Sequence, residues 1–135
     1  MSCMTKYSEK IAYQDGAYPE SHEKRTARIL VDVLNEKILF LASDRQRGTK
    51  TPDIRMKGLL WEIKSPKGKS SRTIENNFRI AAKQSQNIIF DLSRTSIQDD
   101  KALSQINKQF RENKSAKRII VITKKRKLVD IKRHP

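Results

Sequence analysis

Two apolar runs of strand length, at residues 87–92 and 118–123, constrain the fold of this chain more than any other part of its sequence. Each run follows a segment, 70–85 or 99–113, in which apolar residues recur at the spacing of an amphipathic helix. A short continuous apolar run is typical of a strand that is buried on both faces of a sheet. A helix that joins two such strands makes a crossover between parallel neighbours, which is right-handed in nearly all proteins. We therefore expect an α/β fold.

The first half of the chain is predicted to form one helix followed by three antiparallel strands. Apolar residues recur at helical spacing in 21–35, and a strand is expected at 37–42. The next strand is expected to begin at Asp53 and to be joined by a tight turn to a strand at 59–65. With a closing hairpin strand at 127–132, the order α-β-β-β-α-β-α-β-β predicts an α/β sandwich around a mixed sheet.

The length of the chain limits the number of domains. A sequence of 135 residues has room for one domain of ordinary size. Residues 1–18 are polar and show little periodicity, so we expect a loosely ordered N-terminal arm with one short helical turn. The remaining residues, 19–135, are predicted to form a single domain.

The charge of the chain predicts a polyanionic partner. Lysine and arginine total 30 against 15 aspartate and glutamate, which gives a formal net charge of +15. This excess is far larger than solubility requires, and it is typical of a protein that binds nucleic acid. A membrane surface is the competing polyanion, but no apolar run is long enough to span a bilayer.

Cysteine and histidine usage narrows the chemistry and the compartment. The start of the chain lacks the apolar stretch of a signal peptide, and Cys3 is the only cysteine, so an internal disulfide framework is excluded. We therefore expect the folded protein to act in a reducing cytoplasm. Cys3, His22 and His134 are too few and too far apart in sequence to predict a zinc site.

The residues that carry most functional information are Asp53, Glu62 and Lys64, which form an acid, eight intervening residues and then acid-x-Lys. If 59–65 is a strand, side-chain alternation places Glu62 and Lys64 together on one exposed face. Trp61 then lies on the other face, where we expect it to be part of the core. A turn near Lys57-Gly58 would place Asp53 at the start of the neighbouring strand.

This arrangement predicts a metal-dependent phosphodiesterase. A hard cation such as Mg²⁺ takes oxygen ligands and keeps several waters, and Asp53 and Glu62 could supply the protein ligands. Lys64 could orient or deprotonate the attacking water, or stabilise charge that develops on the phosphate. The structural alternative is a turn aspartate after proline at Asp53, with a solvated strand face and an ion pair at Glu62 and Lys64.

The motif resembles that of the PD-(D/E)xK nuclease superfamily, in which two acids bind metal and a lysine assists the nucleophile. A longer part of the chain, about 20–125, resembles the tRNA-cleaving C-terminal toxin domain of CdiA, the bacterial contact-dependent inhibition effector. The segments that carry this resemblance are Lys50-Thr51-Pro52-Asp53-Ile54, Leu60-Trp61-Glu62-Ile63-Lys64-Ser65-Pro66, Thr73-Ile74-Glu75 and the run that begins at Lys83-Gln84 and ends at Asp91. The resemblance implies a compact tRNA ribonuclease that a dedicated immunity protein neutralises. Because this chain is so basic, we expect the immunity protein to be acidic.

A further acid is expected from the helix at 21–35. Glu23 lies on its apolar face, and the nuclease resemblance also implies an acid on this helix, so Glu23 is a candidate fourth catalytic residue. Glu20 shares that face and is the alternative. The structural alternative for Glu23 is that it complements the helix dipole, with Ser21 as the N-cap.

Several polar and basic residues near the motif are candidate substrate contacts. The resemblance makes Ser65, Thr73 and Gln84 candidate secondary or substrate-binding residues. The loop at 65–72 is suited to phosphate contacts, although it lacks the order of a nucleotide-binding Walker loop. The basic run 124–127 is ambiguous, because charged turns are usually only solvated. The basic residues expected to line a groove for the RNA backbone are Arg45, Arg47, Lys50, Lys67, Lys69 and Arg72.

Two other functions remain open at this point. A DNA endonuclease of the same superfamily would use the same catalytic residues. A noncatalytic basic module would bind nucleic acid without cutting it, but carboxylates on a phosphate-binding face repel the ligand unless a cation intervenes. The sequence therefore favours a metal-dependent tRNA endonuclease that acts as a toxin.

Overall fold

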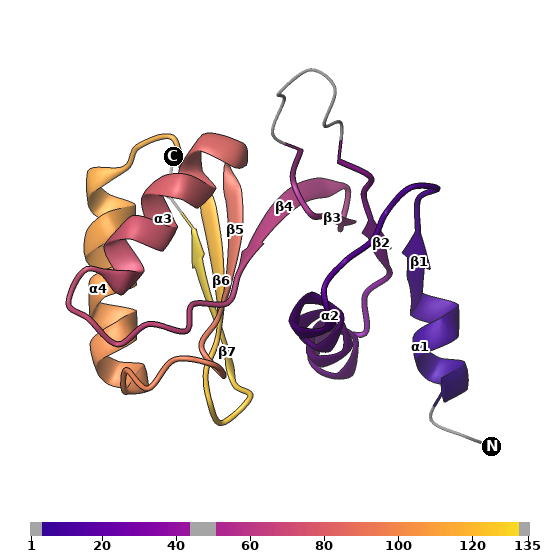
Figure 1. The fold of residues 1–135 in the computed structure, drawn as a ribbon, viewed down its shortest axis with the longest axis horizontal. Coiled ribbons are helices and arrows are strands. Elements are labelled where there is room, and N and C mark those ends of the chain that lie inside the picture. Colours follow the sequence, from indigo (N-terminus) through magenta and orange to yellow (C-terminus); the bar gives the residue numbers. More distant parts are fainter. Residues whose placement is uncertain (1–3, 44–50, 133–135) are drawn as a thin grey trace. The chain divides into compact units, whose positions relative to one another are not determined.

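The computed structural model describes residues 4–43 and 51–132, in which four helices and seven strands are formed (Figure 1). The elements are α1 Met4–Lys10, β1 Ile11–Tyr13, α2 Ser21–Leu34, β2 Ile38–Phe40, β3 Ile54–Met56, β4 Leu59–Lys64, α3 Thr73–Gln84, β5 Asn87–Asp91, α4 Asp99–Glu112, β6 Arg118–Ile122 and β7 Leu128–Lys132. From α2 onward this is the predicted order, and each predicted element is present with ends that differ by a few residues.

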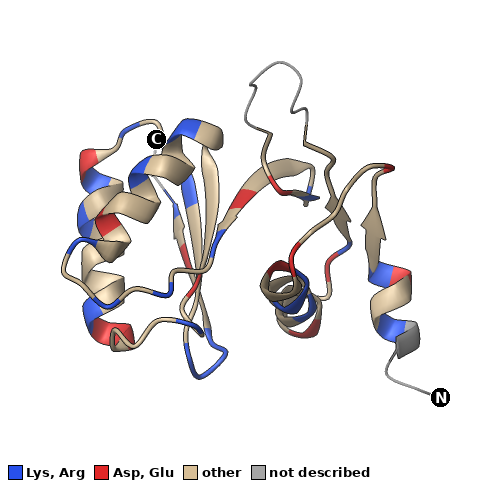
Figure 2. Cartoon of the chain, in the orientation of Figure 1, with Lys and Arg blue, Asp and Glu red and all other residues tan. Residues whose placement is uncertain are grey.

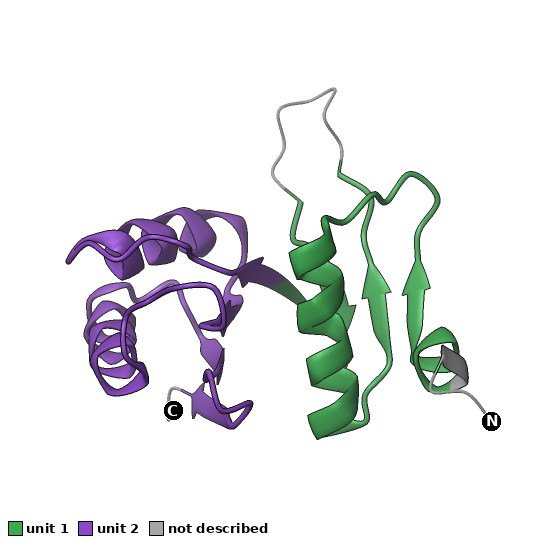
Figure 3. Ribbon diagram, turned by 60° about the horizontal axis from the view of Figure 1, so that its bottom comes forward, with its two compact units in different colours: residues 1–61 green, residues 62–135 purple. Residues whose placement is uncertain are grey.

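The chain divides into two compact units, Met1–Trp61 and Glu62–Pro135, coloured separately in Figure 3. The boundary falls inside β4. The N-terminal arm was expected to hold one short helical turn, and it instead contains the seven-residue helix α1 and the strand β1, which was not expected. α1 is tied to α2 by Asp32, whose carboxylate accepts hydrogen bonds from Lys6 at 2.8 Å and from the Tyr7 hydroxyl at 3.0 Å. Such short elements depend on tertiary contacts and leave no periodic signal in the sequence.

The first unit is built from a short parallel pair followed by an antiparallel meander. β1 pairs with β2 in parallel, and β2, β3 and β4 pair antiparallel, which confirms the three predicted antiparallel strands. The β3–β4 turn is Lys57-Gly58, and both residues have positive φ, 56° and 74°. Two positive φ values in a two-residue hairpin loop match the natural twist of the strands, and glycine adopts this conformation without steric cost.

Helix α2 supplies much of the core of the first unit. Its buried residues include Ala27, Leu30 and Val31, as its periodicity predicts. Its N-cap is Glu20, and not Ser21 as expected from the sequence. The reason is a capping box between Glu20 and Glu23. The side chain of each residue accepts a hydrogen bond from the backbone N–H of the other. These bonds satisfy N–H groups at the start of the helix that have no partner within it.

In the second unit, the end of β4 pairs in parallel with β5, β5 pairs in parallel with β6, and β7 returns antiparallel to β6. The predicted β4–α3–β5 crossover is thus confirmed. Figure 1 shows α3 and α4 on the same face of these strands. Apolar residues of both helices pack there on β5 and β6 in one cluster, which includes Ile74, Phe78, Ile106, Phe90 and Val121.

The strands follow the order β1-β2-β3-β4-β5-β6-β7 in one mixed sheet, so the α/β class and the mixed sheet are confirmed. The predicted sandwich arrangement around this sheet stays a prediction. No helix within 4–43 and 51–132 is long and apolar enough to cross a bilayer.

Candidate functional site

Strand β4 presents Glu62 and Lys64 on the face that α3 covers. In the parallel register, Glu62 pairs with Ile88 and Lys64 pairs with Phe90. Register partners in a sheet point to the same side, and Ile88 and Phe90 belong to the core cluster beneath α3 and α4. The alternation predicted for the acid-x-Lys motif is therefore present.

The two charged groups of this motif form an ion pair. Lys64 Nζ lies 3.5 Å from Glu62 Oε2, and the side chains are 20% and 6% exposed, respectively. The expectation that Glu62 lies on an exposed face was wrong, because this face is covered by a helix. A carboxylate removed from water in this way is costly unless positive charge and hydrogen bonds compensate it.

Gln84, the last residue of α3, supplies such a hydrogen bond. With its amide nitrogen facing the carboxylate, Gln84 donates to both oxygens of Glu62, at 3.1 Å to Oε1 and closer to Oε2. The hydrogen-bond network assigns this amide orientation, because the opposite one would place an oxygen against a carboxylate. Glu62, Lys64 and Gln84 therefore form one polar cluster, which we call the Glu62 cluster.

Asp53 belongs to the first unit and lies just before β3. Its N–H donates to the carbonyl of Trp61 at 3.0 Å, and its carbonyl accepts from the N–H of Leu41 at 2.9 Å. The backbone of Asp53 is thus fixed by both neighbouring strands. Trp61 is fully buried and donates from Nε1 to the carbonyl of Met56, which confirms the prediction that it is a core residue.

Ser65 and Thr73 lie on either side of the loop that follows β4. Ser65 has a buried hydroxyl with no hydrogen-bond partner among the described residues. Thr73 Oγ1 is 3.2 Å from Ser70 Oγ, and a Cβ at Gly68 would approach that Thr73 oxygen to 2.5 Å, so the loop is tightly folded onto the start of α3. Their roles in substrate binding stay predictions.

The side chain of Glu23 is engaged at the start of α2. Its Oε1 accepts a hydrogen bond of 2.8 Å from the N–H of Glu20, as the N3 residue of the capping box. Glu23 thus lies in the first turn of α2, where its charge complements the helix dipole as the structural alternative anticipated, whereas its capping-box contact with Glu20 was not anticipated. A catalytic role for Glu23 stays a prediction.

The predicted basic groove is described only in part. Arg45, Arg47 and Lys50 lie outside the described residues. Lys67, Lys69 and Arg72 are exposed on the loop after β4. Of these, Arg72 is paired with Glu75 on α3, at 3.6 Å.

One acid was missed at the sequence level. Asp91 closes β5 and is fully buried, and its Oδ1 accepts a hydrogen bond of 3.0 Å from the N–H of Ser93. Its position follows that of Phe90, the register partner of Lys64, so it lies one residue beyond the motif on the adjacent strand. The available signal was a single acid within the largely apolar run 87–92.

The donor chemistry of the motif suits a hard cation, although the protein ligands are few. Within 4–43 and 51–132, no group of three or more His, Cys, Asp or Glu side chains lies close enough together to hold a metal ion. Mg²⁺ needs only one or two carboxylates, since it keeps several waters. The buried carboxylate of Glu62, an oxygen donor, fits this requirement.

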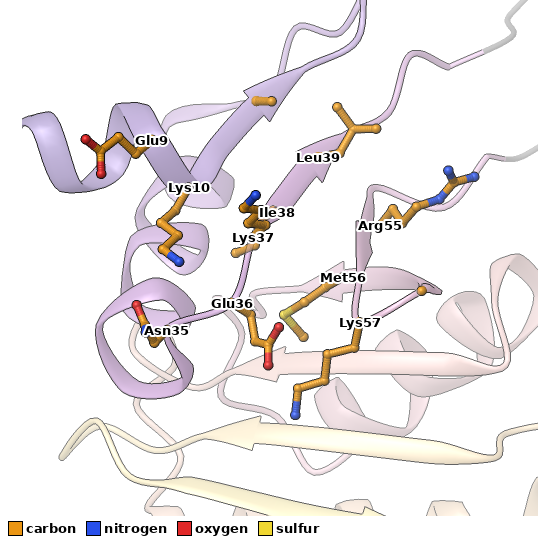
Figure 4. A pocket seen from close by; sticks show the side chains of 12 residues that line it. Glu9, Lys10, Asn35, Glu36, Lys37, Ile38, Leu39, Arg55, Met56 and Lys57 are labelled. Atoms are coloured by element: carbon orange, nitrogen blue, oxygen red, sulfur yellow. The ribbon is translucent and has the colours of Figure 1, made fainter.

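A separate pocket of about 660 Å³ lies within the first unit (Figure 4). Its lining includes the apolar residues Leu39 and Met56, cationic residues such as Lys10 and Lys57, and the acids Glu9 and Glu36. None of the residues predicted from the sequence as site residues lines it, so it is distinct from the Glu62 cluster.

The family model of the contact-dependent growth inhibition CdiA C-terminal domain matches residues 50–128. The chain belongs to this family. The matched segment contains Asp53 and all three members of the Glu62 cluster. No curated protein matches the chain.

Among solved structures, a chain of the CdiA-CT/CdiI toxin and immunity complex from Burkholderia pseudomallei has the same fold. The two chains are 17% identical with a TM-score of 0.65, and the match covers 90% of this chain and 99% of the other. The CdiA C-terminal domain fold therefore extends over nearly the whole sequence, beyond the segment that the family model matches.

Proposed function

We propose that this chain is a contact-dependent inhibition toxin domain that is delivered into target cells and cleaves tRNA in a metal-dependent reaction. The observation that carries the proposal is the Glu62 cluster: a buried carboxylate held between an ammonium group and an amide, in a domain of the CdiA C-terminal family. A strongly basic chain of this family is suited to a nucleic-acid substrate.

In this proposal each residue of the motif has a distinct task. Glu62 and Asp53 would hold Mg²⁺, which when bound supplies charge neutralisation on the phosphate and a water of lowered pKa. Lys64 stabilises negative charge on the scissile phosphate and is available to exchange a proton with the nucleophile. Gln84 donates to both oxygens of Glu62, so it fixes the orientation of that carboxylate and acts as a positioning residue.

The protein partner in this proposal is a cognate immunity protein with an acidic surface. The matched structure in Burkholderia pseudomallei is a toxin and immunity complex, and the positive charge of the present chain suits an acidic partner.

The deciding experiment is a cleavage assay on purified tRNA and on plasmid DNA, with either Mg²⁺ or EDTA. We expect tRNA fragments with Mg²⁺, intact tRNA with EDTA, and no cleavage by Glu62→Gln. The variant Glu75→Gln is a matched control, because Glu75 is a half-buried acid on α3 that pairs with Arg72 and Arg79. Cut plasmid beside intact tRNA would replace the RNA substrate with DNA, and cleavage in EDTA would exclude the metal-dependent reaction.

A further inference from the structure

The segment at 95–99, which leads from β5 into α4, makes hydrogen bonds to two basic loops of the second unit. These are the loop at 65–72 and the β6–β7 turn. Thr95, which is buried, donates from Oγ1 to the carbonyl of Gly68 at 2.5 Å, and its Oγ1 also accepts from the N–H of Ile97 at 3.2 Å. The loop at 65–72, with its three cationic side chains, is therefore fastened to this segment.

The β6–β7 turn is also hydrogen-bonded to this segment, through Lys124. The N–H of Lys124 donates to the carboxylate of Asp99 at 3.2 Å, and Lys124 Nζ donates to the carbonyl of Ile97. Lys124 Nζ also lies 3.8 Å from Asp99 Oδ1, which compensates the charge of that acid. The remaining cations of the turn, Lys125, Arg126 and Lys127, are exposed.

A pocket of about 350 Å³ lies where the loop at 65–72 meets the 95–99 segment and the start of α4. Its lining residues come from the loop, the segment and α4, and they are Lys69, Ser96, Ile97, Gln98 and Lys101. Both lysines are exposed, and neither is paired with an acid of the described parts of the chain. Asp100 is an exposed acid beside Lys101 in sequence, so the local charge is positive but not uniformly so.

The distribution of charge along the chain also favours this unit as the anion-binding part. Glu62–Pro135 contains 19 of the 30 lysine and arginine residues and only seven of the 15 acids. Figure 2 shows cationic positions on α3, on α4 and at the β6–β7 turn. A local excess of this size attracts a polyanion, and an open pocket within it marks where one anionic group can be held.

We propose that the Lys69–Lys101 pocket binds a backbone phosphate of the nucleic-acid substrate, at a position separate from the Glu62 cluster. The two ammonium groups supply point charges, and the Ser96 hydroxyl and the Gln98 amide supply hydrogen-bond donors, which are the usual contacts to phosphate oxygens. The pocket reads no base, so it positions the substrate without selecting a sequence. This inference rests on the proposed function, because it assumes a nucleic-acid substrate.

The test compares two double variants that remove the same charge. Lys69→Gln/Lys101→Gln alters the pocket, and Lys108→Gln/Lys114→Gln removes two exposed lysines elsewhere in the second unit. Binding to purified tRNA is measured in EDTA, which separates binding from cleavage, over a range of salt concentrations. Thermal unfolding of each variant checks that the fold is kept.

We expect the pocket variant to bind tRNA about tenfold more weakly than the wild type, and the control variant within about twofold of it. The slope of log K against log salt should fall by about 0.7–0.9 for each phosphate contact that is lost. Equal losses in both variants, or no loss in either, would overturn the pocket. Binding to poly-glutamate, a probe for an acidic protein, is measured for the same variants. If the pocket variant binds tRNA as the wild type does but loses poly-glutamate binding, the pocket is a surface for an acidic protein and the phosphate site is overturned.

The same measurements distinguish a failure of the proposed nuclease function from a failure of the phosphate site. If the wild type binds tRNA through the pocket but does not cleave it with Mg²⁺, the nuclease proposal fails and the phosphate site stands. If the wild type cleaves tRNA while the pocket variant binds and cleaves as well as the wild type does, the nuclease proposal stands and the phosphate site fails.

Discussion

Glu62 and Lys64 lie on one covered face of β4 with their charged atoms 3.5 Å apart, and Glu62 is almost fully removed from solvent. This ion pair affects the stability of the fold as well as the proposed chemistry. Removing one partner leaves the other charge in a medium of low polarity, where it is poorly solvated. If this site is catalytic as proposed, a variant at either residue changes stability as well as activity, so both have to be measured.

The variant Lys64→Met tests this coupling. We expect cleavage to fall by at least about 100-fold, because the group proposed to stabilise transition-state charge is lost. The free energy of unfolding should also fall, by about 1–3 kcal/mol, since Glu62 loses its ion partner. Kinetic assays and urea denaturation measure the two effects. Lys83→Met is the matched control, because Lys83 is an exposed lysine of α3, and it should change neither quantity appreciably.

Gln84→Ala tests the positioning role of the amide. The carboxylate of Glu62 then loses a charge-assisted donor, so the free energy of unfolding should fall by about 1–2 kcal/mol. Cleavage should fall about tenfold with little change in tRNA affinity, because Gln84 acts through Glu62. Gln86→Ala removes the same side chain from an exposed position just after α3 and is the control. Equal effects of both substitutions would remove the positioning role.

The acid-x-Lys motif could be placed from the sequence because its arrangement depends on local geometry. Alternation within one strand puts Glu62 and Lys64 on the same face whatever the strand packs against. Whether that face is open or covered depends on where α3 lies, and this is decided by the packing of Ile74 and Phe78 on β5 and β6. The burial of Glu62 was therefore beyond the reach of the sequence pattern.

The difference between local patterns and long-range contacts also explains why β1 was not predicted. The long amphipathic helices and the apolar strands carry their own periodicity, so they were found with small errors at their ends. β1 has three residues, and its register with β2 places Ile11 beside Ile38, a long-range contact with no local pattern. The pocket at Lys69 and Lys101 likewise joins residues that are distant in sequence.

The turn of the β3–β4 hairpin offers a test of the backbone that carries the motif. Gly58 has φ of 74° and open space around its Cβ position, so Gly58→Ala should cost about 1 kcal/mol through backbone strain alone. Lys57 also has positive φ, at 56°, and asparagine tolerates this conformation better than lysine. Lys57→Asn should therefore raise the unfolding temperature, while Gly58→Ala lowers it. Changes of the same sign in thermal denaturation would contradict the turn geometry.

Arg118 and Asp130 form a cross-strand pair between β6 and β7, with contacts of 3.1 Å from Nε and 2.6 Å from Nη2. The hydrogen bonds that Arg118 donates to Asp130 raise the pKa of Arg118 above its ordinary value. A raised pKa in the folded state gives stability that is present at every pH below the unfolded pKa of arginine. Arg118→Gln should therefore lower the free energy of unfolding by about 1 kcal/mol, equally at about pH 6 and pH 9.

Arg55→Gln is the control for this pair, because Arg55 is an exposed strand arginine without an ion pair to any described acid. It should change the unfolding free energy by less than about 0.5 kcal/mol. A difference between Arg118→Gln and the wild type that disappears at about pH 9 would contradict the assignment, since the guanidinium stays charged there.

The last prediction concerns the immunity protein. If its surface is acidic, long-range attraction to this chain accelerates encounter, and salt weakens that attraction as the screening length shortens from about 30 Å at 0.01 M to about 8 Å at 0.15 M. The association rate constant should then fall at least about tenfold over this range, while the dissociation rate constant changes much less. Stopped-flow fluorescence of Trp61, the single tryptophan, or a surface-binding assay measures both constants. An association rate that does not respond to salt would show that shape and apolar contacts, and not charge, select the partner.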